Sequence, residues 1–148
     1  MEPAKTIPII TGAVFMTAAA IALWWQVGTG GDGDLHVYFF DVGQGDSALI
    51  VTPEGRQVLV DGGPAPDSAI RALSEAMPEG DRSLDLVVVT HLDADHSRGL
   101  IDVLDQYEVG AIVAGTESST ASMYAQWQAG VERNKVDVVS VHQGYALD

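Results

Sequence analysis

The stretch from residue 84 to residue 99 reads LDLVVVTHLDADHSRG, and it decides the fold. Residues 84–89 are almost all apolar, which is typical of a strand covered on both faces of a sheet. The polar segment at residues 90–98 follows at once. Its side chains of the metal-binding types are His91, Asp93, Asp95 and His96. We therefore expect a buried strand that delivers a metal-binding loop.

The spacing of these four residues suits two neighbouring metal ions. In extended backbone, His91, Asp93 and Asp95 project to one side, while the small or apolar residues between them point away. His96 breaks this alternation and can turn toward a second cation. Two-metal hydrolysis uses such paired cations. A solvated polar turn is the alternative interpretation, but four ligand-type residues directly after an apolar strand favour metal binding.

Strands and helices alternate on both sides of this loop. The strands that we expect cover residues 35–40, 48–52, 57–60, 84–89, 111–114 and 136–141. The helices that we expect cover residues 66–77, 99–107 and 119–133. The turn at residues 53–56 reads PEGR and predicts a hairpin between its flanking strands. This alternation predicts a layered α/β domain.

The N-terminal region predicts a membrane anchor. Residues 7–27 carry no charge and, at about 1.5 Å per residue, can cross roughly 30 Å of hydrocarbon. Trp24 and Trp25 lie at the end of this run, where their rings favour the interface. Lys5 precedes the run and Arg56 is the next basic residue, so the positive-inside rule predicts an extracytoplasmic domain. A cleaved signal peptide is the alternative, which the length of the run and the missing cleavage motif disfavour.

Composition limits the chemistry of the chain. We expect an anchor at residues 1–27, a flexible glycine-rich linker at 28–34 and one domain at 35–148. The 148 residues include no cysteine, so a metal must be held by histidines and carboxylates. The net charge is −14, from 21 acidic and 7 basic residues, and no basic cluster for nucleic acid is present. A nuclease is not excluded, because bound cations neutralise the acidic side chains that hold them.

Two motifs resemble a known family. HLDADH at residues 91–96 resembles the H-x-[HD]-x-D-H signature of the metallo-β-lactamase superfamily. FFDVGQGDSALIVTPEGRQVLVDGG at residues 39–63 resembles the opening of the metallo-β-lactamase-like domain of ComEC-type DNA-uptake proteins, where it also follows membrane segments. The resemblance covers residues 35 to about 141. It implies the N-terminal half of an αββα sandwich, preceded here by one transmembrane helix.

The resemblance also implies roles for the residues of the metal loop. It implies two divalent metal ions, zinc or manganese. His91 and Asp93 correspond to ligands of the first ion, and Asp95 and His96 to ligands of the second. Asp95 would also shape the activated water. Asp93 stands where the family more often has histidine, and an added oxygen ligand shifts the preference from zinc toward manganese.

Residues outside the metal loop match the family pattern as well. Asp61 corresponds to an aspartate that supports the loop, and such a carboxylate orients a ligating histidine. Asp41, Gln44 and Asp46 correspond to the family's glycine-bounded turn near the site. A turn stabilised only by its own Asx hydrogen bonds is the alternative for these three.

The remaining ligands of the family are not recognised in this chain. They are a histidine, a metal-bridging aspartate and a final histidine, all well downstream of the first motif. His142 follows His96 in the sequence, and its surroundings do not match, so we interpret it as structural. We therefore expect a domain that is incomplete at its C-terminus, with one sheet face and the site left open.

Three functions stay open at this point. The first is a phosphodiesterase or DNase of DNA uptake at the membrane, with DNA as substrate and other competence membrane proteins as candidate partners. The second is a small-molecule metallohydrolase that acts on a β-lactam, thioester or lactone. The third is a non-catalytic, membrane-tethered fragment. The opening segment and the anchor favour the first function, and the missing ligands favour the third.

Overall fold

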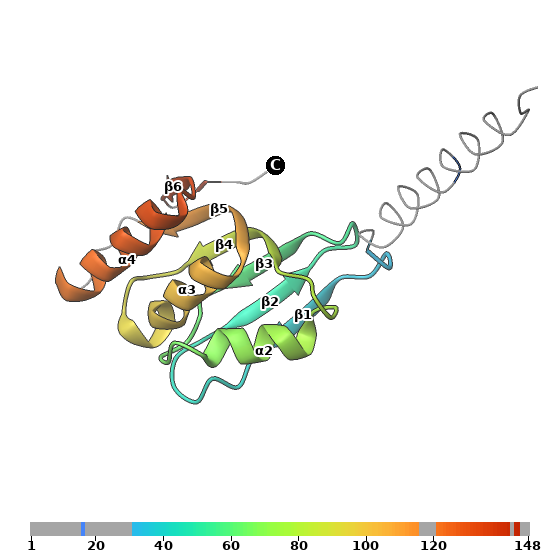
Figure 1. Cartoon of the computed structure of the whole chain (residues 1–148), viewed down its shortest axis with the longest axis horizontal. Helices are drawn as coiled ribbons and strands as arrows, with labels where there is room; N and C mark the ends of the chain where they lie inside the picture. The colour runs from blue at the N-terminus through green and yellow to red at the C-terminus, as the bar shows by residue number, and fades with distance from the viewer. Residues whose placement is uncertain (1–15, 17–30, 116–120, 143, 146–148) are drawn as a thin grey trace, which may run out of the picture.

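The computed structural model describes residues 16, 31–115, 121–142 and 144–145 of the chain. Six strands form one mixed sheet in the order β1-β2-β3-β4-β5-β6 (Figure 1). The strands are β1 (His36–Phe39), β2 (Ala48–Val51), β3 (Gln57–Val60), β4 (Ser83–Val89), β5 (Glu108–Gly115) and β6 (Val138–Val141). The helices are α2 (Ser68–Ala76), α3 (Ala94–Gln106) and α4 (Ala121–Asn134). The mixed α/β architecture expected from the sequence is confirmed.

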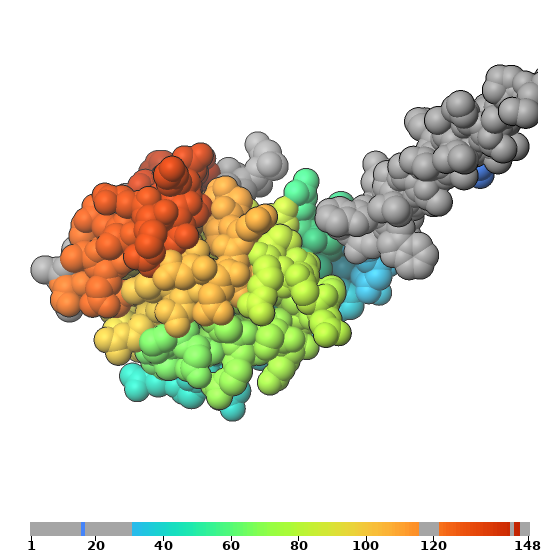
Figure 2. All heavy atoms as spheres, in the orientation of Figure 1, coloured from blue at the N-terminus to red at the C-terminus, as the bar shows by residue number. Residues whose placement is uncertain are grey.

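The strand pairing changes from antiparallel to parallel at β3. β1, β2 and β3 pair antiparallel, and the predicted turn between β2 and β3 closes through the N–H of Thr52 and the carbonyl of Arg56, 2.9 Å apart. β3, β4, β5 and β6 pair parallel, each joined to the next through one helix. Crossovers of this kind are right-handed, so successive helices come to one face of the sheet. α3 accordingly lies between α2 and α4 in one layer (Figure 2).

The face under the helices holds the apolar core. Leu49 pairs with Leu59, Leu59 with Val87, and Val87 with Ile112, so the four side chains form a row across the sheet. All four are fully buried. The helices contribute Leu73, Leu100, Val103 and Trp127 to the same core. Full burial of an aliphatic side chain of this size stabilises the fold by about 1.5–3 kcal/mol.

The opposite face of the sheet is also apolar but carries no helix of the described part of the chain (Figure 1). Alternate residues of a strand face opposite sides. The side chains on this face therefore include Val58, Val60, Leu86, Val88, Ala111 and Val113. Most of them are half-buried, and at the edge Phe39 is 86% exposed. Within residues 84–89, Leu84, Val87 and Val89 are buried, whereas Leu86 and Val88 are only half-buried, so the expected burial on both faces is reached in part.

One boundary differs from the sequence prediction in a way that affects the site. α3 begins at Ala94, whereas we expected extended backbone up to Asp95 and a helix from residue 99. The carbonyl of Asp93 accepts the N–H groups of His96 and Ser97 at 3.0 and 2.9 Å, which closes the first turn. Asp95 lies in that turn, where a carboxylate interacts favourably with the helix dipole. The predicted extended alternation is therefore wrong after Asp93.

The predicted anchor at residues 1–27 lies outside the described residues except for Met16, and so does the linker before Gly31. Within residues 16, 31–115, 121–142 and 144–145, each helix is too short or too polar to cross a bilayer. The anchor and the extracytoplasmic placement of the domain stay predictions.

Candidate metal centre

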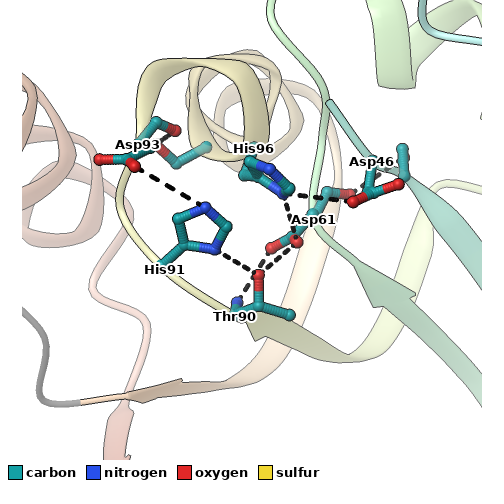
Figure 3. Close-up of polar contacts among 8 residues, drawn as sticks. Asp46, Asp61, Thr90, His91, Asp93 and His96 are labelled. Atoms are coloured by element: carbon teal, nitrogen blue, oxygen red, sulfur yellow. Dashed lines mark hydrogen bonds and ion pairs between the residues drawn. The ribbon is translucent and has the colours of Figure 1, made fainter. Parts of the chain in front are cut away.

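The candidate centre lies where β3 and β4 end. These strands are parallel neighbours, so their carboxyl ends meet at one edge of the sheet. Asp61 follows β3 directly, Thr90 and His91 follow β4, and His96 lies in the first turn of α3. Figure 3 shows these four side chains directed toward one another. Three segments that are distant in sequence thus form one polar cluster.

Asp61 is the buried centre of this cluster, with 1% of its surface exposed. Its Oδ1 accepts the N–H of Thr90 at 2.9 Å, and its Oδ2 accepts the Thr90 hydroxyl at 2.6 Å. The same Oδ2 lies 3.0 Å from Nδ1 of His96. Its backbone has a φ of 54°, which is uncommon outside glycine and tends to occur at functional sites where neighbouring contacts fix it. One such contact comes from the hydroxyl of Ser47, which donates to the Asp61 carbonyl at 3.0 Å.

The two histidines stand side by side beyond Asp61. The centroids of the His91 and His96 rings are 3.9 Å apart. One nitrogen of each ring and one oxygen of Asp61 all lie within 4.8 Å of one another. Nδ1 of His91 lies 2.9 Å from the Thr90 hydroxyl, and its Nε2 lies 3.8 Å from Oδ2 of Asp93. Each ring therefore has Nδ1 beside a hydrogen-bond partner and a second nitrogen available to a metal.

The two aspartates of the loop occupy different positions. Asp93 is the N-cap residue of α3, but its carboxylate does not cap the helix, and its side chain is 63% exposed. That carboxylate lies beside His91, with Oδ2 3.8 Å from Nε2 of the ring (Figure 3). Asp95 is half-buried in the first helical turn, one residue before His96. The structure thus places Asp93 beside His91, and Asp95 on α3 with His96.

The turn at residues 41–47 packs against the metal loop. Gly45 has a φ of 79°, and a Cβ atom there would lie 1.8 Å from the carbonyl oxygen of Asp95. Because only glycine allows this approach, the turn supports the backbone of the loop from outside. The carbonyl of Asp46 accepts the N–H of Gly63 at 3.2 Å, which also ties the turn to the end of β3.

The three polar residues of that turn separate into different roles. Asp46 reaches the centre, with Oδ2 3.9 Å from Nδ1 of His96, although its side chain is 84% exposed. Asp41 accepts the N–H of Gly43 at 3.2 Å, which is the Asx turn that formed the alternative interpretation. Gln44 is exposed. Asp46 is therefore the member of this set that the structure brings to the histidines.

Two residues of the centre were missed in the sequence. Thr90 contacts both Asp61 and His91 through its hydroxyl. Ser97 is fully buried, and its hydroxyl donates to the Asp93 carbonyl at 2.8 Å, which helps to fix the start of α3. A hydroxyl residue directly before the first histidine and another directly after the second were the available signals.

The donor set fits a divalent cation. Imidazole nitrogens with carboxylate oxygens suit zinc, and a larger share of oxygen suits manganese. Among the described residues, no lysine or arginine forms a salt bridge with the carboxylates of the cluster, namely Asp46, Asp61, Asp93 and Asp95. Asp61 already accepts three hydrogen bonds while buried, so we assign it to orientation and the outer nitrogens and carboxylates to the cation.

Comparison with known proteins identifies the family. The description "Metallo-beta-lactamase superfamily" matches residues 40–145. The chain belongs to this superfamily. The match spans β2 to β6 and includes both the turn at residues 41–47 and the metal loop. The broad resemblance seen in the sequence is thereby confirmed, while the ComEC-type branch stays a prediction.

Among the solved structures that are similar to this chain, MEM-A1 shows the same fold. The subclass B3 metallo-β-lactamase MEM-A1, from a soil metagenome library, has 16% identity and a TM-score of 0.53, covering 81% of this chain and 47% of that one. The Rm3 metallo-β-lactamase has 24% identity and a TM-score of 0.45, covering 60% and 31%. A HARLDQ-motif mutant of a Cronobacter sakazakii metallo-β-lactamase has 22% identity and a TM-score of 0.45, covering 58% and 32%. The chain spans less than half the length of each of these proteins.

Proposed function

We propose that this chain carries the N-terminal half of a metal-dependent phosphodiesterase that cleaves DNA at a membrane during DNA uptake. The observation that carries the proposal is the cluster of His91, His96 and Asp61 at the carboxyl ends of β3 and β4, with Asp93 beside it. Superfamily membership supports hydrolysis. The segment at residues 39–63 and the uncharged run at residues 7–27 support the DNA-uptake branch over its relatives.

The residues would divide the work in a simple way. His91 with Asp93, and His96 with Asp95, would hold two divalent cations, which supply charge stabilisation at phosphate and an activated water. Asp61 holds His96 by its Nδ1 atom, 3.0 Å away, and keeps that ring in place. Asp93 offers an oxygen where the family more often has histidine, so we expect manganese to support activity better than zinc.

A second αβ layer would complete the domain. The uncovered face of the sheet is apolar across its central strands, and its edge residue Phe39 is 86% exposed. A face of this kind packs against another layer in stable domains. This chain covers 47% of the length of MEM-A1, and the rest of MEM-A1 is long enough to form such a layer. We infer that a second layer on this face would bring the family's remaining ligands to the cluster.

The test uses the natural polypeptide that contains this chain, purified in detergent. Fluorescent single-stranded DNA is incubated with it in Mn²⁺, in Zn²⁺ or in chelator. We expect cleavage that needs metal, falls at least a hundredfold in His91→Ala and persists in His142→Ala. His142 is a matched control because it is exposed at the end of β6.

The other functions are separate outcomes of this test. Hydrolysis of nitrocefin or a lactone with DNA left intact would replace the proposal with a small-molecule hydrolase, the activity that the names of the three similar structures suggest. If the protein binds no metal stoichiometrically and cleaves neither substrate, the function that remains is the non-catalytic fragment.

A further inference from the structure

Thr90 links His91 to the buried carboxylate of Asp61. Its hydroxyl oxygen lies 2.6 Å from Oδ2 of Asp61 and 2.9 Å from Nδ1 of His91. Its backbone N–H donates to Oδ1 of Asp61 at 2.9 Å. His96 contacts the same carboxylate directly, through its Nδ1 atom at 3.0 Å. One residue between β4 and the loop therefore connects His91 to Asp61 (Figure 3).

The direction of each hydrogen bond follows from counting protons. An ionised carboxylate accepts only, so the single hydroxyl proton of Thr90 must lie on the 2.6 Å contact to Asp61. If that proton pointed to His91 instead, two oxygen acceptors would face each other at 2.6 Å with no hydrogen between them. The Thr90 oxygen can then only accept from His91. Nδ1 of His91 must therefore carry the proton.

The same argument determines which nitrogen of the His96 ring carries the proton. Nδ1 of His96 faces Oδ2 of Asp61, which accepts only, so this nitrogen also carries its proton. A neutral imidazole has one protonated nitrogen, and its other nitrogen keeps the lone pair that binds metal. Both histidines would thus present Nε2 as the ligand atom, and both would owe this state to one carboxylate.

We propose that Thr90 is a positioning residue that fixes the tautomer and orientation of His91, by relaying the carboxylate of Asp61 to a ring that Asp61 does not touch. The inference rests on the proposed role of the cluster as a metal centre. It adds a separate claim, namely that the two histidines are set by different contacts. His96 depends on its direct contact with Asp61, whereas His91 depends on Asp61 through the hydroxyl of Thr90.

Two variants separate the hydroxyl from the shape of the side chain. Thr90→Val keeps the branched shape and the backbone N–H but removes the hydroxyl. Thr90→Ser keeps the hydroxyl. The full chain has four histidines, so His36 and His142, which are outside the cluster, supply reference signals. Circular dichroism and thermal unfolding establish that both variants are folded.

The primary readout is the imidazole ¹⁵N spectrum of the metal-free chain in alkaline buffer. In the original chain, we expect both His91 and His96 to be protonated at Nδ1. In Thr90→Val, we expect His91 to lose this preference while His96 keeps it, and in Thr90→Ser both rings should be as in the original chain. A His91 spectrum that Thr90→Val leaves unchanged would overturn the proposal, as would equal changes in both rings.

A Co²⁺ titration followed by its visible absorption gives the second readout. We expect Thr90→Val to weaken binding about tenfold, at the lower end of the effect of removing an outer partner of a metal ligand, and Thr90→Ser to restore it. Equal affinity in the original chain and Thr90→Val would also overturn the proposal. If DNA is not the substrate, both readouts stay valid, so failure of the proposed activity and failure of this inference are distinguishable.

Discussion

The amino and carboxyl ends of the parallel strands β3 and β4 use aspartate in opposite ways. At the amino end, Asp85 accepts hydrogen bonds from the guanidinium of Arg56 at 2.6 Å and from the N–H of Gln57 at 2.8 Å. Asp81 there accepts from the Gln57 side chain at 2.6 Å. At the carboxyl end, Asp61 is buried, and its side-chain partners in the described part of the chain are Thr90 and His96.

The two ends differ in whether the hydrogen-bond partners of the aspartates keep a lone pair that can bind a metal. At the amino end, a guanidinium, a side-chain NH2 and a backbone N–H donate to the aspartates, and none of these donor nitrogens has a lone pair to offer to a cation. A histidine that donates from Nδ1 still has a lone pair on Nε2. In the proposed metal centre, the buried charge at the carboxyl end would thus orient two nitrogen ligands. At the amino end, the carboxylates hold neighbouring strands and loops together through hydrogen bonds.

The largest expected effect comes from exchanging one carboxylate at each end. Asp61→Asn keeps the shape but replaces one accepting oxygen with a donor, so Thr90 and His96 lose an acceptor. We expect metal affinity to fall about 10–100-fold, measured by Co²⁺ titration. The matched variant Asp85→Asn should leave affinity unchanged. Equal losses in both variants would show that the two ends do not differ as we argue.

The supporting turn offers a second pair of variants. Gly45→Ala would place Cβ 1.8 Å from the Asp95 carbonyl oxygen, whereas Gly43→Ala, with a similar φ of 83°, meets no atom within 4 Å. Both should lose about 1–3 kcal/mol of stability from the left-handed backbone alone. We expect Gly45→Ala to lose more stability in urea unfolding and also to weaken metal binding several-fold. If the two variants behave alike, the turn does not support the loop.

The ion pair at the amino end should have a small effect on stability. Arg56 is well exposed, so its bond to Asp85 is screened by solvent. We expect Arg56→Gln to lower the free energy of unfolding only slightly. Metal affinity should stay the same. A change in metal affinity would mean that the two ends are coupled through β3 and β4.

The smallest expected effect is in the acid range and belongs to Asp81. Burial raises its pKa, but hydrogen bonds from Ser83 and Gln57 outweigh burial and hold the pKa below its ordinary value. A lowered folded-state pKa stabilises the fold above the unfolded pKa of about 3.9, and this stability is lost as the pH falls through the folded pKa. We expect Asp81→Asn to flatten the loss of stability below about pH 4. If the free energy of unfolding falls equally steeply with pH in the original chain and in the variant, the prediction is wrong.

Local patterns in the sequence predicted most of the fold. The PEGR turn predicted the β2–β3 hairpin, and alternating apolar runs predicted every strand and helix of the described residues, with ends within a few residues. The start of α3 was wrong because residues 90–98 were interpreted as a polar loop, whereas the helix begins at Ala94. Within the helix, Gly99 lets α3 approach the backbone of Gly62, where a Cβ would lie 2.0 Å from the carbonyl oxygen. Such packing depends on a distant segment and leaves no local signal.

The candidate site was partly predictable for the same reason. HLDADH identified the candidate ligands because they are adjacent in sequence. The approach of Asp61 to His96 and the role of Thr90 depend on the parallel register of β3 and β4, which no local pattern contains. Asp46 and Asp41 looked equivalent in the sequence, and only the fold of their turn separates them.

The most direct test of the account is calorimetric titration of the metal-free chain with Mn²⁺ and Zn²⁺, beside the double variant His91→Ala/His96→Ala. The net charge of −14 makes weak, nonspecific cation binding a baseline that the neutral substitutions leave in place. We predict a saturable, stoichiometric phase in the original chain that disappears in the double variant. The same titration curve in both proteins would contradict a metal centre at the carboxyl ends of β3 and β4.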